Sequence, residues 1–141
     1  MQTFMPYPGF SDSLLCLDYR RLGKQRVEAK QLITAVVAPQ TTGWANHPAA
    51  RMWFGYVGAL KLYHDLAILT WVNRGYRNNM EYFNPPEDSI VLPPWLGDQA
   101  FHDSHKSNLL RKAPDYYGQF GWQVPSDLPY IWPNPKDYET A

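Results

Sequence analysis

The sequence predicts an all-α protein, in which residues 1–141 form a single compact domain of three helices with long loops rich in proline and aromatic residues. Apolar residues recur at helical spacing in three separate stretches of the chain. Nine of the 13 prolines follow residue 84, where they mark loops. A chain of 141 residues with 45% hydrophobic content is large enough for one core and too short for several domains.

The first helix is predicted for residues 11–37, because Leu22, Ala29 and Val36 recur at seven-residue spacing. Residues 1–10 contain two prolines and a glycine, which prevent a helix from starting there. We therefore expect this N-terminal stretch to run extended over the surface.

Two further helices follow. The second is predicted for residues 48–74, with a proline in its first turn and a basic residue and a glycine at its end. Residues 78–94 form an acidic, proline-rich connection. Asp98 caps the third helix, which continues to about residue 112 and is followed by a proline. The aromatic stretch 116–132 is expected to wrap around the helices.

Charge is unevenly distributed along the chain. The 13 Lys+Arg balance the 13 Asp+Glu, which argues against binding nucleic acid by bulk charge alone. However, residues 18–30 carry a net charge of +3 and residues 101–112 carry +2, whereas residues 76–100 and 113–141 each carry −3. If folding brings the two basic segments together, they form a positive surface suited to a phosphate-rich ligand. The alternative is two separate solvated helix faces.

The cysteine content and the N-terminal residues indicate in which cellular compartment the protein is expected. Cys16 is the only cysteine, so an internal disulfide and a cysteine zinc site are both excluded. Residues 1–10 lack the basic and apolar regions of a signal peptide, and no 18-residue apolar run occurs. We expect a cytoplasmic monomer that uses no metal or other cofactor and does not bind membranes.

Polar residues of the first predicted helix lie at the boundary between its apolar stripe and solvent. At about 100° per residue, Arg21, Gln25 and Glu28 lie along one edge of the stripe and Arg26 lies on the opposite edge. Partial burial raises the pKa of a carboxylate, and neighbouring arginines lower it. Such opposed effects on one carboxylate are common at sites of acid–base catalysis. The alternative is that Arg21 and Glu28 form an ordinary helix-surface pair.

The segment 44–53, WANHPAARMW, is dense in functional residue types for a junction between a loop and a helix. A helix N-terminus presents free N–H groups and partial positive charge. Asn46, His47 and Arg51 are therefore candidates for holding a phosphate or a sugar oxygen, with Trp44 supporting distorted DNA. The alternative is that Asn46 or His47 caps the helix and the tryptophans pack.

The third predicted helix carries a run of hydrogen-bonding residues. His105, Asn108 and Lys112 share one face, which matches a strip that follows a phosphate backbone. Further candidates for DNA contact on this helix are Lys106, Ser107 and Arg111. Tyr116 and Tyr117 are candidates for stacking on unpaired bases, since every base offers a π-face. For the tyrosines, packing is the alternative.

Three segments carry a resemblance to a known family: residues 20–28 (RRLGKQRVE), 73–76 (NRGY) and 111–118 (RKAPDYYG). Together they resemble the pyrimidine dimer DNA glycosylase family, also called endonuclease V of bacteriophage. The resemblance implies an endonuclease V-like helical fold that binds duplex DNA, kinks it and flips a nucleotide out. It also implies that the α-amine of the chain attacks the sugar C1′, supported by a helix-borne glutamate next to an arginine.

On this resemblance, the candidate catalytic residues are Met1, Glu28 and Arg26. An α-amine titrates near a pH of about 8, so it can act as a nucleophile at neutral pH without burial. The family removes its Met before a small Thr, whereas Gln2 is bulky, and we expect Met1 to be retained. In the register that places Arg26 on the family's arginine, Val27 stands where the glutamate belongs, and Glu28 comes one residue later.

The sequence therefore predicts a DNA glycosylase that excises a damaged or modified pyrimidine base from double-stranded DNA by nucleotide flipping, with abasic-site lyase activity as a further expectation. The cations expected to contact phosphates are Arg20, Arg21, Lys24, Arg111 and Lys112, and Gln25 is a further candidate for contact with the DNA substrate. Two alternatives remain. The one-residue shift of Glu28 is consistent with a non-catalytic binder of distorted or modified DNA. The zero net charge is consistent with an enzyme that hydrolyses free modified nucleosides or nucleotides.

Overall fold

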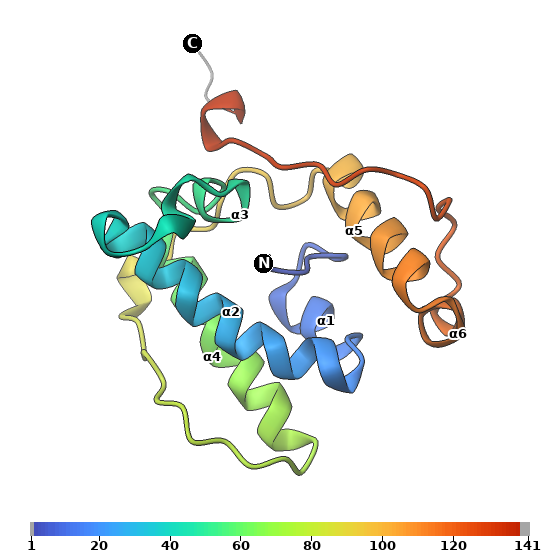
Figure 1. Ribbon diagram of the computed structural model, residues 1–141, viewed down its shortest axis with the longest axis horizontal. Coiled ribbons are helices and arrows are strands. Elements are labelled where there is room, and N and C mark those ends of the chain that lie inside the picture. The colour runs from blue at the N-terminus through green and yellow to red at the C-terminus, as the bar shows by residue number, and fades with distance from the viewer. Residues whose placement is uncertain (1, 139–141) are drawn as a thin grey trace.

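The computed structural model describes residues 2–138, which form α-helices and short 3-10 helices and contain no strand (Figure 1). The α-helices are α1 (Phe10–Leu15), α2 (Tyr19–Val37), α3 (Pro48–Arg51), α4 (Val57–Asn73), α5 (Gln99–Lys112) and α6 (Pro114–Tyr117). The 3-10 helices are η1 (Pro39–Thr41), η2 (Gly43–Asn46), η3 (Glu87–Ser89), η4 (Gly118–Phe120) and η5 (Pro135–Tyr138). The prediction of an all-α fold is confirmed, with six α-helices among the described residues in place of three.

The first predicted helix, residues 11–37, is divided into α1 and α2. Asp18 at the break has an extended backbone, with φ −66° and ψ 163°. Its backbone N–H donates to the Tyr117 hydroxyl oxygen at 3.1 Å, and its carboxylate accepts hydrogen bonds from that hydroxyl and from Arg21. Burial raises the pKa of Asp18, but these two hydrogen bonds, with the charge of Arg21 and a hydrogen bond from its backbone, together outweigh burial and hold the pKa below its ordinary value.

The second predicted helix, residues 48–74, is also divided, into α3 and α4. The turn between them, residues 52–56, contains Gly55 with φ +87°, a left-handed conformation that favours glycine. Phe54 is 42% exposed because the chain turns there.

The third predicted helix is confirmed as α5. The Asp98 carboxylate caps it by accepting a hydrogen bond from the Ala100 N–H at 3.2 Å. Pro114 follows its end and begins α6. The C-terminal segment, residues 121–134, then runs back along α5 and past α3, so the expectation that the end of the chain wraps the helices is confirmed (Figure 1).

The N-terminal segment, residues 2–9, lies in the middle of the molecule, between α2 and α5 (Figure 1). Met5 is fully enclosed and Phe4 is 6% exposed. The expectation that this segment runs over the surface is therefore wrong. Side chains that are distant in sequence enclose it and bind its backbone.

Gln25 of α2 and Tyr63 of α4 hold the start of the N-terminal segment. The Gln25 Oε1 accepts hydrogen bonds from the Phe4 N–H at 2.9 Å and from the Tyr63 hydroxyl at 2.6 Å, and its Nε2 donates to the Gln2 carbonyl at 3.2 Å. Tyr63 also donates to the Phe4 carbonyl oxygen at 3.0 Å. The buried N–H and carbonyl groups of Phe4 and the carbonyl of Gln2 thus have protein partners.

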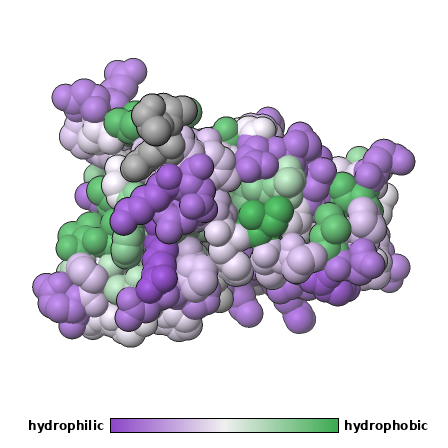
Figure 2. Space-filling model, turned by 90° about the horizontal axis from the view of Figure 1, so that it is seen from above, coloured by the Kyte–Doolittle hydropathy of each residue, from purple (hydrophilic) through white to green (hydrophobic). Residues whose placement is uncertain are grey.

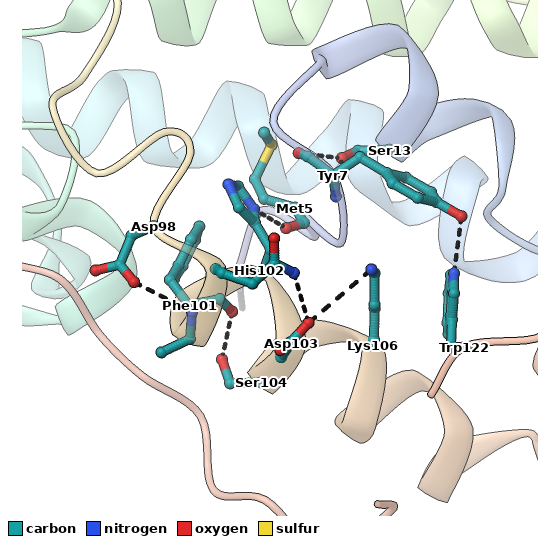
Figure 3. A network of polar contacts seen from close by, with 12 residues as sticks. Met5, Tyr7, Ser13, Asp98, Phe101, His102, Asp103, Ser104, Lys106 and Trp122 are labelled. Atoms are coloured by element: carbon teal, nitrogen blue, oxygen red, sulfur yellow. Dashed lines mark hydrogen bonds and ion pairs between the residues drawn. The ribbon is translucent and has the colours of Figure 1, made fainter. Parts of the chain in front are cut away.

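Two histidines of α5 hold Met5 from the other side. The His105 Nδ1 accepts from the Met5 N–H at 2.8 Å, so its proton resides on Nε2. The His102 Nε2 accepts from the Gly97 N–H at 2.8 Å, and its Nδ1 donates to the Met5 carbonyl at 2.7 Å (Figure 3). Burial, with a smaller contribution from His102, lowers the pKa of His105 to about 3.

The surface is mixed in character. Seen from above, hydrophobic side chains form small patches that hydrophilic side chains separate (Figure 2). Among residues 2–138, no helix combines the length and the apolar character that crossing a membrane requires.

Candidate functional site

A pocket of about 1020 Å³ opens where α2, the N-terminal segment and the end of α5 meet. It is lined by Gln2, Phe4, Tyr19, Arg20, Arg21, Gly23, Lys24, Val27, Glu28, Gln31, Trp71 and Lys112. Four of these side chains are cations and one is a carboxylate. A concave surface with this charge is suited to a phosphate-rich ligand.

The spacing of residues along α2 explains which of its side chains reach the pocket. Arg20, Lys24 and Glu28 stand four residues apart, so they lie one above the other on the same helix face. Arg20 and Lys24 are exposed, and Glu28 is half-buried. The cations therefore lie towards solvent, and the carboxylate lies deeper.

Glu28 contacts the start of the chain. Its Oε2 accepts a hydrogen bond from the Gln2 backbone N–H at 3.1 Å. Since Gln25 binds the Gln2 carbonyl, both backbone groups of this residue are bound by α2. Met1 precedes Gln2 in the chain and lies outside the described residues.

Lys112, the last residue of α5, brings the second basic segment to the pocket. Its Nζ lies 5.9 Å from the centre of the Phe4 ring and 5.8 Å from the centre of the Tyr130 ring. Both distances are within the range of a cation–π interaction, which fixes the ammonium group opposite α2. The two basic segments thus meet, as their charge suggested, through Arg20, Arg21, Lys24 and Lys112.

Arg26 is not among the pocket-lining residues. Its guanidinium carbon lies 4.4 Å from the centre of the Trp71 ring, and its Nη1 donates to the Asn78 Oδ1 at 2.9 Å. Two residues before Glu28, it points about 200° away from that side chain around the helix. Arg26 therefore binds the back of a pocket-lining tryptophan, and the structure does not bring it together with Glu28.

Aromatic residues that sequence reasoning missed form one wall of the pocket. Tyr19 is 54% exposed and stacks on Trp71, with ring centres 5.4 Å apart and an angle of 22° between the planes. Tyr76 packs on both rings. A Cβ on Gly23 would lie 3.1 Å from the Trp71 ring, which explains how the helix approaches so closely. The position of Tyr19 directly before the basic run 20–21 was a usable signal in the sequence.

Two of the three residues of the polar strip predicted on α5, His105 and Asn108, are buried, as is the separate candidate Ser107, whereas Lys112 is exposed at the pocket. His105, Ser107 and Asn108 are at most 1% exposed. The Ser107 Oγ accepts from the Leu128 N–H at 2.9 Å, and the Asn108 Nδ2 donates to the Leu128 carbonyl at 3.1 Å. These side chains hold the N-terminal and C-terminal segments against α5. Because enclosed side chains do not reach a phosphate, they are not DNA contacts.

Two further cations of α5 lie outside the pocket lining. Arg111 donates to the Ser126 carbonyl at 2.9 Å. The Lys106 Nζ lies 3.9 Å from the Asp103 Oδ1 and 5.2 Å from the centre of the Tyr7 ring (Figure 3). Arg111 thus holds the C-terminal segment, and Lys106 packs on the N-terminal segment.

The candidates of segment 44–53 lie at η2 and α3, apart from the pocket lining. His47 caps α3, because its Nδ1 accepts a hydrogen bond at 3.0 Å from a backbone N–H in the first turn. Its ring contacts that of Trp44, which is 41% exposed. Asn46 and Arg51 are exposed. The structure therefore favours the capping interpretation for His47.

Tyr116 and Tyr117 are also outside the pocket lining. Tyr117 is fully enclosed and binds Asp18 through its hydroxyl, and burial raises its pKa. Tyr116 is half-buried, with its hydroxyl 3.4 Å from the Leu17 carbonyl. A buried ring has no free face, so the packing interpretation holds for Tyr117.

Comparison with known proteins gives one match. The family model described as pyrimidine dimer DNA glycosylase matches residues 1–84. This match covers more than half of the chain and includes Glu28, with all the pocket-lining residues except Lys112. No curated protein and no solved structure matches the chain. The family match is sufficient to assign the chain, which belongs to the pyrimidine dimer DNA glycosylase family.

Proposed function

We propose that this protein is a DNA N-glycosylase that releases a base of a pyrimidine dimer from duplex DNA and then cleaves the strand as an abasic-site lyase. One observation carries the proposal. The Glu28 Oε2 lies 3.1 Å from the Gln2 backbone nitrogen, inside a pocket lined by four cations. The start of the chain, a carboxylate and phosphate-binding charge are therefore close together.

The α-amine of Met1 is the proposed nucleophile. Its nitrogen attacks C1′ of the damaged nucleotide, and the bond from C1′ to the base breaks. The base takes that electron pair and a proton and stays joined to the neighbouring pyrimidine through the cyclobutane ring. Opening of the sugar ring, whose O4′ takes up a proton, leaves an imine between the amine and C1′. Loss of a C2′ proton from the imine then forms a C2′–C3′ double bond as the 3′ phosphate leaves with the electron pair of the C3′–O bond, which cleaves the strand. Glu28 stabilises the positive charge that develops on the sugar and takes up the proton that the amine loses.

The pocket wall supports a role in holding distorted DNA. Arg20, Lys24 and Lys112 are available for phosphates. The exposed face of Tyr19, which Trp71 supports from behind, is available for stacking on an unstacked base. Extrusion of a nucleotide costs a few kcal/mol, least at a damaged base, and stacking on tyrosine offsets part of that cost.

The test uses a duplex with a single thymine cyclobutane dimer and sodium borohydride, which reduces an imine to a stable amine. We expect base release, measured as cleavage of the N-glycosyl bond of one pyrimidine of the dimer, together with strand cleavage and a covalent adduct that peptide mapping locates at residue 1. Base release without an adduct would remove the lyase step and the proposed nucleophile. Salt-dependent binding without any product would reject the glycosylase and favour the non-catalytic binder.

A further inference from the structure

The N-terminal segment has a further anchor, which lies in the turn 52–56 between α3 and α4. The Trp53 Nε1–H donates a hydrogen bond to the Thr3 hydroxyl oxygen at 3.1 Å, and both residues are fully enclosed. A tryptophan side chain has a single polar group, and buried polar groups are nearly always hydrogen-bonded. Thr3 therefore gives the indole N–H the partner that its burial requires.

Trp53 is itself held on several sides. Its ring packs edge to face with that of Trp95, with ring centres 5.0 Å apart, and it also contacts Phe10 and Tyr63. The carbonyl of the preceding residue, Met52, accepts a hydrogen bond from the Trp95 Nε1 at 2.8 Å. The core thus fixes both the ring and the backbone here, so the indole N–H has a fixed position.

This anchor is close to the start of the chain. Residue 3 is two peptide units from residue 1, and each unit spans about 3.8 Å between Cα atoms. The residue between them, Gln2, is bound through its backbone by Glu28 and Gln25 of α2. Trp53 binds the next side chain from a different part of the fold. Two separate elements therefore determine where the start of the chain lies.

We infer that Trp53 is a positioning residue for the α-amine of the chain, and that it acts through Thr3 by fixing the start of the chain at the pocket. This inference rests on the proposed function, in which the amine attacks C1′. A nucleophile must lie within about 3.5 Å of the atom that it attacks, and a displacement of about 1 Å can lower the rate roughly 100-fold. Loss of one of the two anchors should therefore slow the attack.

The first experiment measures imine formation as the single-turnover rate of borohydride trapping on a duplex with an abasic site, at saturating protein. Thr3→Val removes the hydroxyl acceptor and keeps the shape, and we expect a rate about 10-fold below wild type. Thr3→Ser keeps an acceptor and should restore most of the rate. Gln2 follows Met1 in every variant, so the same N-terminus is expected, and intact mass checks it.

Affinity is measured separately, on a duplex with a tetrahydrofuran abasic analogue, which cannot form an imine. Thr3 is not among the pocket-lining residues, so we expect Thr3→Val to bind this duplex as wild type does. The expected loss is thus in the rate at saturation and not in binding.

Thr70→Val is the matched control. Thr70 is also buried, and its hydroxyl donates to the Leu66 carbonyl at 2.7 Å within α4, outside the pocket lining. Both Thr→Val variants lose one hydroxyl hydrogen bond, and we expect both to lower Tm. All rates are measured at a temperature at which circular dichroism shows each variant to be folded. A merely structural role would leave the rate of the folded protein unchanged, as we expect for Thr70→Val.

A double-mutant cycle tests whether Thr3 acts through Trp53. Trp53→Phe removes the N–H donor, and we expect it to lower the rate as Thr3→Val does, with no further loss when the two changes are combined. An undiminished rate for Thr3→Val, an equal loss for Thr70→Val, no recovery with Thr3→Ser, or losses that multiply in the double variant would overturn the inference. Each of these leaves the proposed function intact, because wild type still forms the adduct at residue 1. No adduct with wild type would overturn the proposed nucleophile and this inference together.

Discussion

At the scale of single residues, Gln25 links the packing of the molecule to its site. The sequence pattern predicts that it borders the apolar stripe of its helix, and we interpreted it as a substrate contact. It is 1% exposed and binds Gln2, Phe4 and Tyr63 through one carboxamide. Periodicity identified its face of the helix, but its partners are 21 to 38 residues away along the chain, so no local pattern reports them.

Replacing Gln25 should therefore loosen the N-terminal segment. Gln25→Leu leaves the Phe4 N–H and the Gln2 carbonyl buried without partners, at about 1–3 kcal/mol each. We expect a loss of about 3 kcal/mol in the free energy of unfolding, which lowers Tm by roughly 10 °C. Gln31→Leu, on the exposed side of the same helix, is the control and should change Tm little. Equal Tm values for the two variants would contradict this role.

The lowered pKa of His105 predicts how the free energy of unfolding depends on pH. Its pKa is lowered to about 3 in the folded protein, whereas an unfolded chain titrates near about 6.5. Between these values the unfolded state binds the extra proton, so stability falls as the pH falls, by at most about 1.4 kcal/mol per pH unit for one group. Burial also lowers the pKa of His102, and it acts in the same direction.

Urea unfolding at pH 7, 6, 5 and 4 tests this dependence. His105→Asn removes the titrating group, and we expect it to be less stable than wild type at pH 7 and to lose less stability on going to pH 4. Parallel stability curves for wild type and His105→Asn would show that His105 is not responsible.

At the scale of elements, the sequence predicts where a helix begins or ends only if the residues that determine that end are close to it along the chain. The start of α5 was predicted because its cap, Asp98, lies one residue before it, and its end because Pro114 follows. The break between α1 and α2 was not predicted. Tyr117, which binds Asp18 there, is 99 residues away along the chain, and its hydroxyl leaves no sign in the periodicity of the first helix.

The first turn of α4 shows how closely two elements pack. A Cβ on Gly58 would lie 2.1 Å from the Ser89 backbone oxygen at the end of η3. Alanine is a better helix former than glycine by about 1 kcal/mol. However, its Cβ would force the backbone at Ser89 to move, which costs more free energy than this gain. We expect Gly58→Ala to destabilise the protein by about 2 kcal/mol.

Midpoints of urea unfolding measure this effect. Gly118→Ala is the matched control, because open space surrounds that position and its φ of −62° suits any residue. A midpoint for Gly58→Ala at or above that of wild type would contradict the close approach of α4 and η3.

At the scale of the whole molecule, a chain of zero net charge brings four of its 13 cations together at one pocket. The uneven charge in the sequence left open whether residues 18–30 and 101–112 converge, and Lys112 brings the second segment to the pocket that Arg20, Arg21 and Lys24 line. Charge along the sequence does not distinguish cations that face the pocket from cations that bind other parts of the protein. Arg26 and Arg111 have the same charge as Arg20, and only the folded chain shows that they bind Trp71 and the C-terminal segment.

This arrangement predicts the salt dependence of DNA binding. Each phosphate contact contributes about −0.9 to the slope of log K against log salt concentration. Arg20→Gln and Lys24→Gln should each make the slope less steep by about 0.9 and weaken binding for all duplex sequences alike. Lys136→Gln, an exposed cation in η5, should leave the slope unchanged. Equal slopes for all three variants would exclude this pocket as the DNA-binding surface.

The central claim is that base excision requires the carboxylate beside the start of the chain. Single-turnover base release by Glu28→Gln, measured on a thymine dimer duplex at saturating protein, tests it most directly. We predict a rate at least about 100-fold below wild type with DNA affinity nearly unchanged, while Glu81→Gln on an exposed loop releases base normally. A rate for Glu28→Gln close to that of wild type would contradict the account.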